Sequence, residues 1–359
     1  TTVHLEEETL RAYWALYLSA VRGIRTAPDL VAPLEHDLEV EVLQAYAKLA
    51  NTGLVSQKSD GTWKQNSKLV QTMVAEAYQK KGQPVPYTEK GRIKVAREVL
   101  KDSGVEALKT LADVGIAKTL RQTFLKTLWM GTTDPIQCSY QSVRETMRTS
   151  CSRPNLQNLP RRGGVRDCFV ARDGTYLVSC DYSALELRTL AQTCFDLFGF
   201  SSLREAFLAG QDPHTKLAGE GILGITYEEA VKILTSSEHP DFKKVKDARQ
   251  DAKPTNFGLP GGMGAESFVK LAKAQGREFT IDYGKKLKAT WMNTWPEMAP
   301  FFEYAGSACQ DGNAVLMFYR DGFVRGDTPY CAYLNTQFQH PAAMMAKKAL
   351  WEATWEAIM

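Results

Sequence analysis

The stretch "CDYSALELR", residues 180–188, places two acids, Asp181 and Glu186, directly after the apolar run "TYLV". Aromatic and β-branched residues in that run predict a strand that delivers Asp181 to its end. An aspartate at a strand end is commonly a turn or cap residue. The same position also suits a hard-cation ligand, because Mg²⁺ is bound through one or two carboxylates together with substrate phosphates. The stretch by itself leaves both interpretations open.

The composition is that of a soluble globular protein with a large core. The chain has 359 residues, of which 44% are apolar and 24% charged, and its length predicts two or three subdomains. We find no run of about 18 apolar residues, so no membrane span is predicted. The start, "TTVHLEEETLR", is acidic, has no signal-peptide core and has no initiator Met, a pattern expected of a fragment or a processed form.

The cysteines favour a reducing compartment. There are seven, an odd number, and no two are spaced as CxxC. This usage argues against a zinc site and against a disulfide framework, and it predicts a cytoplasmic protein.

Positive charge is concentrated in two stretches although the net charge is only +3. Residues 144–166 hold six Arg against a single acid, Glu145, and residues 243–253 hold five basic residues against two Asp. Local basic stripes on a near-neutral protein indicate a polyanion bound along a defined path. The alternative is a solvated charged face, which is what most single charge runs are.

Helical patterns dominate the first 130 residues. Apolar residues recur at helical spacing from Leu34 to Leu49, and further helices are predicted over 67–82 and 105–129. The intervening "NTGLVSQKSDGTWKQNS", residues 51–67, is predicted to be a loop or a short hairpin.

Two hairpins are predicted after residue 134. One lies in 164–183 around an Arg-Asp-Gly turn, and the other lies in 313–327 around Arg320-Asp321-Gly322. Helical patterns fill 186–290, and residues 342–359 are predicted to form an amphipathic helix. Helices, sheet, helices and sheet in that order predict an α+β protein with a helical insertion in its sheet domain.

The segment "DARQDAKPTNFGLPGGMG", residues 247–264, places Arg249, Lys253 and Phe257 at positions i, i+4 and i+8. This spacing puts two cations and one aromatic ring on one face of a helix. Such a face suits a triphosphate with a base stacked beyond it. The alternative is an amphipathic helix with surface cations and a core Phe.

The segment "MRTSCSRPNLQNLPRR", residues 147–162, has no helix or strand periodicity and is predicted to be a loop. Its arginines suit phosphates, whereas Asn and Gln side chains reach sugar and base-edge atoms. The residues concerned are Arg148, Arg153, Asn155, Gln157, Asn158, Arg161 and Arg162.

Taken together and in this order, the motifs resemble those of family A DNA polymerases, the class of bacterial DNA polymerase I. "RTSCSRPNLQNLP" is similar to the primer-template loop, "DYSALELR" to motif A, and "RQDAKPTNFG" to motif B. "QDPHTK" is similar to the family's Asp-x-His-x-x-Thr region, and "NTQFQ" to a template-contacting helix. The resemblance runs from about residue 90 to the end and is looser before that. Among the family's members, the versions carried by phages of actinobacteria are the most similar, which predicts location in a host-cell cytoplasm.

The resemblance implies a right-hand architecture with a helical thumb, an antiparallel-sheet palm and helical fingers. The thumb and flanking helices are expected over 1–133, the first part of the palm over 134–195, the fingers over 196–290, and the second, incomplete part of the palm over 291–359. The implied reaction is template-directed DNA synthesis in replication, in which two Mg²⁺ ions assist transfer of a nucleotidyl group to a primer 3′-hydroxyl. Primer-template DNA and deoxynucleoside triphosphates are the implied partners.

The resemblance also assigns roles to individual residues. Asp181 matches the aspartate that bridges the two metal ions, with the carbonyl of Tyr182 as a further ligand. Glu186 matches the acid that excludes a 2′-hydroxyl by steric clash. The residues matched to the triphosphate and to the base and sugar are His214, Arg249, Lys253 and Phe257, with Lys253 also a candidate proton donor to pyrophosphate. The residues matched to primer-template contacts are Arg148, Asn155, Gln157, Asn158, Arg162, Asn335 and Gln339.

Four positions depart from the bacterial pattern. Ala184 replaces a glutamine, Gly261 replaces a tyrosine that stacks on the template base, and His340 replaces a glycine. Pro254 directly follows the motif B lysine, and because proline removes a helix hydrogen bond we expect a kinked or shortened helix there.

The family's second catalytic aspartate, in a His-Asp-Glu hairpin, has no match in the sequence. The one His-Asp pair, His36-Asp37, lies in a helical pattern rather than at a hairpin tip. One carboxylate does not easily hold two Mg²⁺ ions, so a second polypeptide that supplies the hairpin is a predicted partner. Two alternatives stay open: a non-catalytic DNA-binding fragment or half of a split polymerase, and a single-subunit RNA polymerase. Glu186 argues against the RNA polymerase, which must admit the 2′-hydroxyl.

Overall fold

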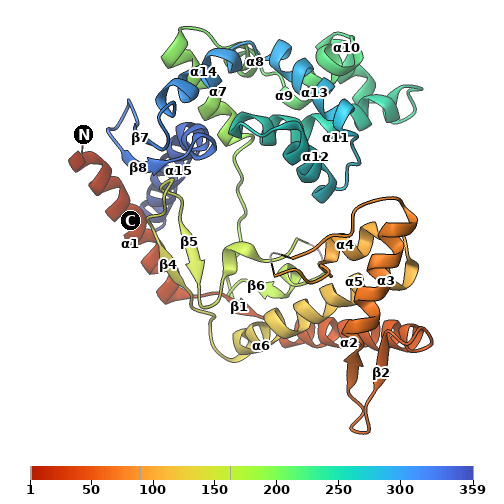
Figure 1. Ribbon diagram of the computed structural model, residues 1–359. Coiled ribbons are helices and arrows are strands. Elements are labelled where there is room, and N and C mark those ends of the chain that lie inside the picture. The colour runs from red at the N-terminus through yellow and green to blue at the C-terminus, as the bar shows by residue number, and fades with distance from the viewer. Residues whose placement is uncertain (1, 89, 162, 359) are drawn as a thin grey trace. The chain divides into compact units, whose positions relative to one another are not determined.

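The computed structural model describes residues 2–88, 90–161 and 163–358, and it describes side chains from residue 6 onward. The fold divides into two compact units (Figure 1). Unit 1 comprises residues 1–17, 140–150 and 180–359, and unit 2 comprises residues 18–139 and 151–179. The helix α1, Thr2–Arg22, and the paired strands β4, Ser139–Gln141, and β5, Ser150–Ser152, run across the boundaries of this division. The four-part division into thumb, palm and fingers stays a prediction.

Unit 2 is a helical bundle that carries short strands at its edges. In α2 the residues Leu38, Val42, Tyr46 and Leu49 are buried at helical spacing, and they pack against α5, which confirms the predicted helix. Its elements are β1 Arg25–Thr26, α2 Pro28–Ala50, β2 Val55–Gln57, β3 Trp63–Gln65, α3 Ser67–Lys80, α4 Arg97–Asp102, α5 Glu106–Leu120, η1 Arg121–Leu125, α6 Lys126–Thr133, η2 Leu156–Asn158, η3 Arg166–Cys168 and β6 Phe169–Val170.

The strands of unit 2 form two small antiparallel pairs. Strands β2 and β3 make the short hairpin that the sequence predicts over 51–67, with Val55 opposite Gln65. Strand β6 pairs with β1, with Thr26 opposite Phe169. The pair His36-Asp37 lies inside α2, as predicted.

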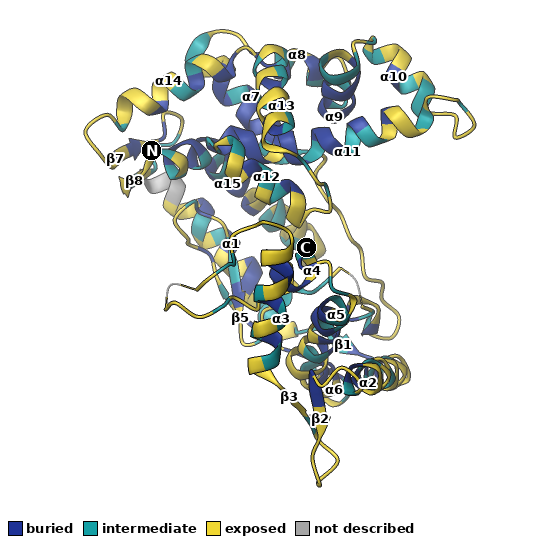
Figure 2. Ribbon diagram, turned by 45° about the vertical axis from the view of Figure 1, so that its right-hand side comes forward, coloured by how far each residue is buried: buried dark blue, intermediate teal, exposed yellow. Residues whose placement is uncertain are grey.

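Unit 1 is built mainly from helices around a core of large side chains. Trp291, Trp295, Phe268 and Phe301 are each no more than 1% exposed, and Figure 2 shows buried stretches along α7, α11 and α15 in dark blue. Its elements after residue 180 are α7 Leu185–Phe198, α8 Ser202–Leu208, α9 Pro213–Lys216, η4 Leu217–Leu223, α10 Tyr227–Leu234, α11 Phe242–Gly258, η5 Leu259–Gly261, α12 Ala265–Ala274, α13 Ile281–Thr294, α14 Met298–Ala308, β7 Ala314–Met317, β8 Val324–Thr328 and α15 Tyr330–Ile358.

Two contacts fix α7 against α15. The hydroxyl of Thr189 donates to the carbonyl oxygen of Phe338 at 2.7 Å, and the hydroxyl of Thr193 donates to that of Gln337 at 3.1 Å. These buried bonds place the middle of α7 beside residues 337–338 of α15.

The hairpin predicted over 313–327 is confirmed. Strands β7 and β8 pair antiparallel, with Leu316 opposite Arg325 and Met317 opposite Val324. The buried His340 of α15 contacts Asp321 in the turn at 2.6 Å and stacks on Phe323 with ring centroids 4.2 Å apart. The histidine that replaces a glycine therefore ties the hairpin to α15.

The other predicted hairpin, over 164–183, is wrong. Only Phe169–Val170 is a strand, and its partner is β1 rather than residues 175–178. Residues 176–183 contain no helix or strand, and Figure 1 draws them as an extended trace that leads into α7. An extended segment becomes a strand only when another backbone pairs with its N–H and C=O groups. In the part of the chain that the structure describes, no strand pairs with this segment.

Proline does not shorten the motif B helix, so the expectation of a shortened helix is wrong. Helix α11 runs from Phe242 to Gly258 with Pro254 inside it. A proline in a helix interior costs about 3 kcal/mol, but the turns on both sides are buried, including Ala252 and Thr255, both 0% exposed. Packing of this face against the core offsets the lost hydrogen bond.

All sheets among the described residues have two strands, so the described fold contains no larger antiparallel sheet of the kind expected for a palm. None of the described helices is both long enough and apolar enough to cross a membrane.

Candidate functional site

Asp181 lies in the extended segment and is exposed to solvent. The apolar residues before it are exposed as well: Tyr176 is 91%, Leu177 57% and Val178 83% exposed. The buried strand that would deliver the aspartate is therefore absent from the described fold. Helix α7 begins four residues after Asp181.

Glu186 lies in the first turn of α7, and its carboxylate pairs with the guanidinium of Arg148. Arg148 is exposed in the loop that connects β4 to β5. An ion pair this accessible adds at most about 1 kcal/mol to stability. The ion pair matters because it brings together two residues predicted to contact different substrates: Glu186 the incoming sugar, and Arg148 the primer.

The predicted cationic face forms on α11. Arg249, Lys253 and Phe257 all lie within this helix, as their spacing predicts. Lys253 is half-buried and Phe257 is 50% exposed. The ring of Phe257 lies against that of His214 of α9, with centroids 5.2 Å apart and planes at 53°.

Asp212 fixes Arg249 on this face. Its carboxylate caps α9 by accepting from the backbone N–H of Thr215 at 3.0 Å and from the Thr215 hydroxyl at 2.6 Å. The same oxygen accepts from Nε of Arg249 at 2.9 Å. Burial alone would raise the pKa of Asp212, but the bond from Thr215 and the charge of Arg249 hold that pKa below its usual value. The arginine is thus oriented before any ligand arrives.

His214 is 7% exposed. Burial lowers its pKa to about 4, because desolvation penalises the imidazolium. Asp212 opposes this shift, and the charges of Arg249 and Lys253 add to it. The imidazole is therefore neutral near pH 7.

Asn335 and Gln339 lie one turn apart on α15. The Asn335 side chain donates to the carbonyl oxygen of Cys331 at 2.7 Å and lies against Gly261. A Cβ atom at position 261 would be 2.9 Å from both the Oδ1 and the Nδ2 of Asn335. A side chain at position 261 would therefore require the end of the Asn335 side chain to shift.

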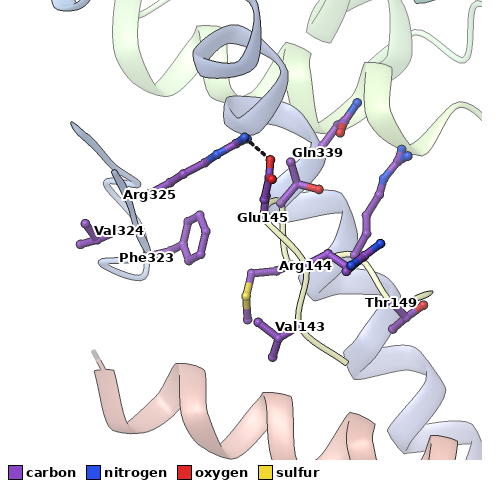
Figure 3. A pocket seen from close by; sticks show the side chains of 11 residues that line it. Val143, Arg144, Glu145, Thr149, Phe323, Val324, Arg325 and Gln339 are labelled. Atoms are coloured by element: carbon purple, nitrogen blue, oxygen red, sulfur yellow. Dashed lines mark hydrogen bonds and ion pairs between the residues drawn. The ribbon is translucent and has the colours of Figure 1, made fainter. Parts of the chain in front are cut away.

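A hollow of about 850 Å³ opens beside Gln339 (Figure 3). Its walls are the loop 143–149, the start of β8 and the middle of α15. Arg148 and Gln339, both predicted to contact DNA, line it together. The ion pair between Arg325 and Glu145 closes one side, as the dashed line in Figure 3 marks. Arg325 also donates to the hydroxyl of Thr336 at 2.7 Å.

The remaining predicted DNA contacts lie in unit 2. Asn155 caps the turn η2, since its Oδ1 accepts from the backbone N–H groups of Gln157 and Asn158, each at 3.2 Å. Gln157 and Asn158 are exposed. Arg162 lies outside the described residues.

The described residues do not fit a Mg²⁺ site by themselves. No group of three or more His, Cys, Asp or Glu side chains in the described part of the chain is arranged to hold a metal ion. Asp181 is a single exposed carboxylate, and Tyr182, adjacent to it, is 50% exposed.

Three anchoring residues were not predicted from the sequence: Asp212, Asn256 and Arg325. Asp212 had an available signal, because Asp before Pro at the first helical position is a common helix start. Asn256 and Arg325 had no such signal, because their partners are distant in the sequence. The two tryptophans that bond Asn256 are 35 and 39 residues away, and Glu145 is 180 residues away from Arg325.

Comparisons with known proteins identify the family. The model for DNA polymerase family A matches residues 63–353. The chain is 31% identical to DNA polymerase I A, chloroplastic/mitochondrial, of Arabidopsis thaliana over 242 residues, which are 60% of this chain and 22% of that protein. It is 36% identical to the thermostable DNA polymerase I of Thermus aquaticus over 129 residues, 35% of this chain and 13% of that protein.

The fold is similar to a solved polymerase domain. The POL domain of Pol1 from M. smegmatis, solved in complex with DNA primer-template and dNTP, superposes with a TM-score of 0.72. The match has 20% sequence identity and covers 98% of this chain and 60% of that one. The chain spans about a fifth or less of the length of the curated relatives named above. Since the family model covers most of the sequence, the chain belongs to DNA polymerase family A.

Proposed function

We propose that this chain takes part in template-directed DNA synthesis during replication, by transfer of a nucleotidyl group to a primer 3′-hydroxyl. The observation that carries the proposal is the α9–α11 face, where Asp212 orients Arg249 beside His214, Lys253 and Phe257. Two cations and a half-exposed ring on one rigid face suit a triphosphate and its base.

In the proposed reaction the primer hydroxyl oxygen attacks the α-phosphorus and pyrophosphate leaves. Arg249 and Lys253 bind the β- and γ-phosphates and balance the charge that develops on the leaving group. Lys253 is the candidate donor of a proton to pyrophosphate. Phe257 packs on the incoming sugar and base, and Glu186 excludes a 2′-hydroxyl.

Each unit is proposed to carry primer-template contacts of its own. In unit 1 these are Arg148, Asn335 and Gln339, around the hollow beside α15. In unit 2 they are Asn155, Gln157 and Asn158, with Arg162 as a further predicted contact. Arginines suit the phosphates, and the amides suit base edges and sugars.

Mg²⁺ is a proposed cofactor, with Asp181 and the carbonyl of Tyr182 as two of its ligands. When bound, the ions would activate the attacking hydroxyl and stabilise charge on the phosphorus. Because the described residues do not complete such a site, we propose that a second carboxylate comes from outside this sequence, on a separate polypeptide or on further chain. The exposed run Tyr176–Val178 supports this, since it offers an unpaired extended backbone to an incoming hairpin.

The same observation favours one alternative, a DNA-binding fragment without activity of its own. The ion pair that holds Glu186 beside Arg148 argues against an RNA polymerase, because it keeps the proposed sugar filter in place. An origin in a phage of actinobacteria, and hence location in host cytoplasm, stays a prediction.

Primer extension by the purified chain with Mg²⁺ and the four deoxynucleotides tests the proposal, beside an Asp181→Ala variant. Extension that the variant abolishes would support a self-sufficient polymerase. No extension, with salt-dependent binding of primer-template DNA retained, would support the fragment. Loss of both extension and DNA binding would contradict both readings.

A further inference from the structure

Asn256 is a buried amide at the end of α11, one residue before Phe257, and it is 1% exposed. Its Oδ1 lies 3.1 Å from the indole nitrogen of Trp291 and 3.1 Å from that of Trp295. Its Nδ2 lies 3.2 Å from the carbonyl oxygen of Pro213 and 3.1 Å from Nδ1 of His214. The side chain thus has a partner for each of its two lone pairs and each of its two N–H groups.

These partners fix which end of the amide faces which way. An indole N–H donates only, so the group that meets both tryptophans must be the amide oxygen. A backbone carbonyl accepts only, so the group that meets Pro213 must be the NH₂. The donor-only indoles and the acceptor-only carbonyl therefore fix the orientation of the Asn256 amide.

The orientation of Asn256 in turn decides where His214 carries its proton. Since the amide NH₂ donates to Nδ1, that ring nitrogen must present a lone pair. In a neutral imidazole the single N–H is then on Nε2. The charged and titratable groups around His214 are Asp212, Arg249 and Lys253, and burial keeps the ring neutral by lowering its pKa to about 4.

We propose that Asn256 is a positioning residue that holds His214 as a neutral Nε2–H donor toward the phosphates of the incoming nucleotide. The proposal rests on the proposed function for its ligand, but not for the tautomer itself. The opposite tautomer would present the Nε2 lone pair to a phosphate oxygen and would repel it. A lost hydrogen bond to a charged group corresponds to a roughly 10- to 100-fold weaker interaction.

The variant Asn256→Asp reverses the arrangement with little change in shape. One carboxylate oxygen still accepts from the two indoles, and the other replaces the NH₂ that faces Nδ1. When ionised, that oxygen can only accept, so His214 must protonate at Nδ1, and the bond to the carbonyl oxygen of Pro213 is lost. Asn293→Asp is the matched control, because Asn293 is exposed on the neighbouring helix α13 and gains the same charge.

The direct test is long-range ¹⁵N–¹H NMR of the chain labelled at its five histidines, with the His214 signals assigned by their absence from His214→Asn. We expect the proton on Nε2 in the wild type and in Asn293→Asp, and on Nδ1 in Asn256→Asp. A proton on Nδ1 of His214 in the wild type would overturn the proposal, and this result needs neither Asp variant to fold.

Single-nucleotide incorporation adds a functional readout. For Asn256→Asp we expect the KM for the nucleotide to rise roughly 10- to 100-fold, with a pH dependence between pH 5 and 8 that the wild type and Asn293→Asp lack. Equal KM values and pH profiles in the two Asp variants would refute the positioning role. No extension by the wild type would support the fragment without activity of its own, whereas the NMR result still decides the tautomer.

Discussion

Two regions of unit 1 hold the proposed catalytic groups in opposite ways. On α9 and α11 the side chains are anchored: Asp212 orients Arg249, and Asn256 joins His214 to two buried tryptophans. Around Asp181 the backbone is extended, the neighbouring apolar side chains are exposed, and no strand among the described residues pairs with it. The nucleotide side is built from contacts within the chain, whereas the carboxylate side has no strand partner among the described residues.

The largest expected effect is on the anchored side, from Lys253→Ala. Removing a cation that faces the developing charge should lower kcat/KM for nucleotides by roughly 10²–10³-fold, measured by single-nucleotide incorporation. Lys244→Ala, at an exposed position on the same helix, should leave it unchanged. An equal loss in both variants would mean that α11 acts only through its overall charge.

Lowering the pH tests the anchored region, because His214 is buried there as a neutral imidazole. Its pKa in the folded state, about 4, lies below the usual 6.5, so the unfolded chain binds more protons between these values. Stability contributed by the neutral ring is therefore full above pH 6.5 and is lost as pH falls toward 4, by up to about 3 kcal/mol. Urea unfolding of the wild type and His214→Asn across this range measures it. Parallel pH profiles would show that His214 is not buried as described.

Asp212→Asn tests how much the negative charge of Asp212 contributes to the position of Arg249. Asparagine still caps α9, so the helix should persist while Arg249 loses its ion pair. We expect a roughly tenfold higher KM for nucleotides and little change in Tm. Asp241→Asn, at the exposed start of α11, is the control. A large fall in Tm for Asp212→Asn would show a structural role instead.

The smallest effect is expected in the exposed segment. Val178→Ala should change the free energy of unfolding by less than about 0.5 kcal/mol, because the side chain is 83% exposed. Val245→Ala, at a position 1% exposed on α11, should cost about 2 kcal/mol. Chemical denaturation of both variants gives the contrast. Equal losses would mean that residues 176–178 are packed in solution.

Local patterns predicted those elements whose stability comes from their own neighbourhood. The i, i+4, i+8 spacing of Arg249, Lys253 and Phe257 places them in one helix, and the Arg320-Asp321-Gly322 turn marks its hairpin. The strand before Asp181 was predicted wrongly because composition cannot report whether a partner backbone is present. The shortening expected at Pro254 was wrong because packing of the buried face outweighs a local penalty.

The anchoring network lay beyond prediction for a related reason. Asn256 bonds to residues 35 and 39 positions away, and no local pattern distinguishes such an asparagine from a surface one. Arg148 and Glu186 were each predicted, but for separate roles, and their contact is visible only in three dimensions.

The close approach of Gly261 to Asn335 links two positions that are 74 residues apart in the sequence. Replacing Gly261 by tyrosine, to restore the bacterial residue, would drive Cβ into the Asn335 amide at 2.9 Å and disrupt its bond to Cys331. The two positions are therefore coupled, because a side chain at position 261 requires the end of the Asn335 side chain to shift. For protein engineering this means that a template-stacking ring is not a single transferable residue in this chain, and libraries at position 261 should vary position 335 with it.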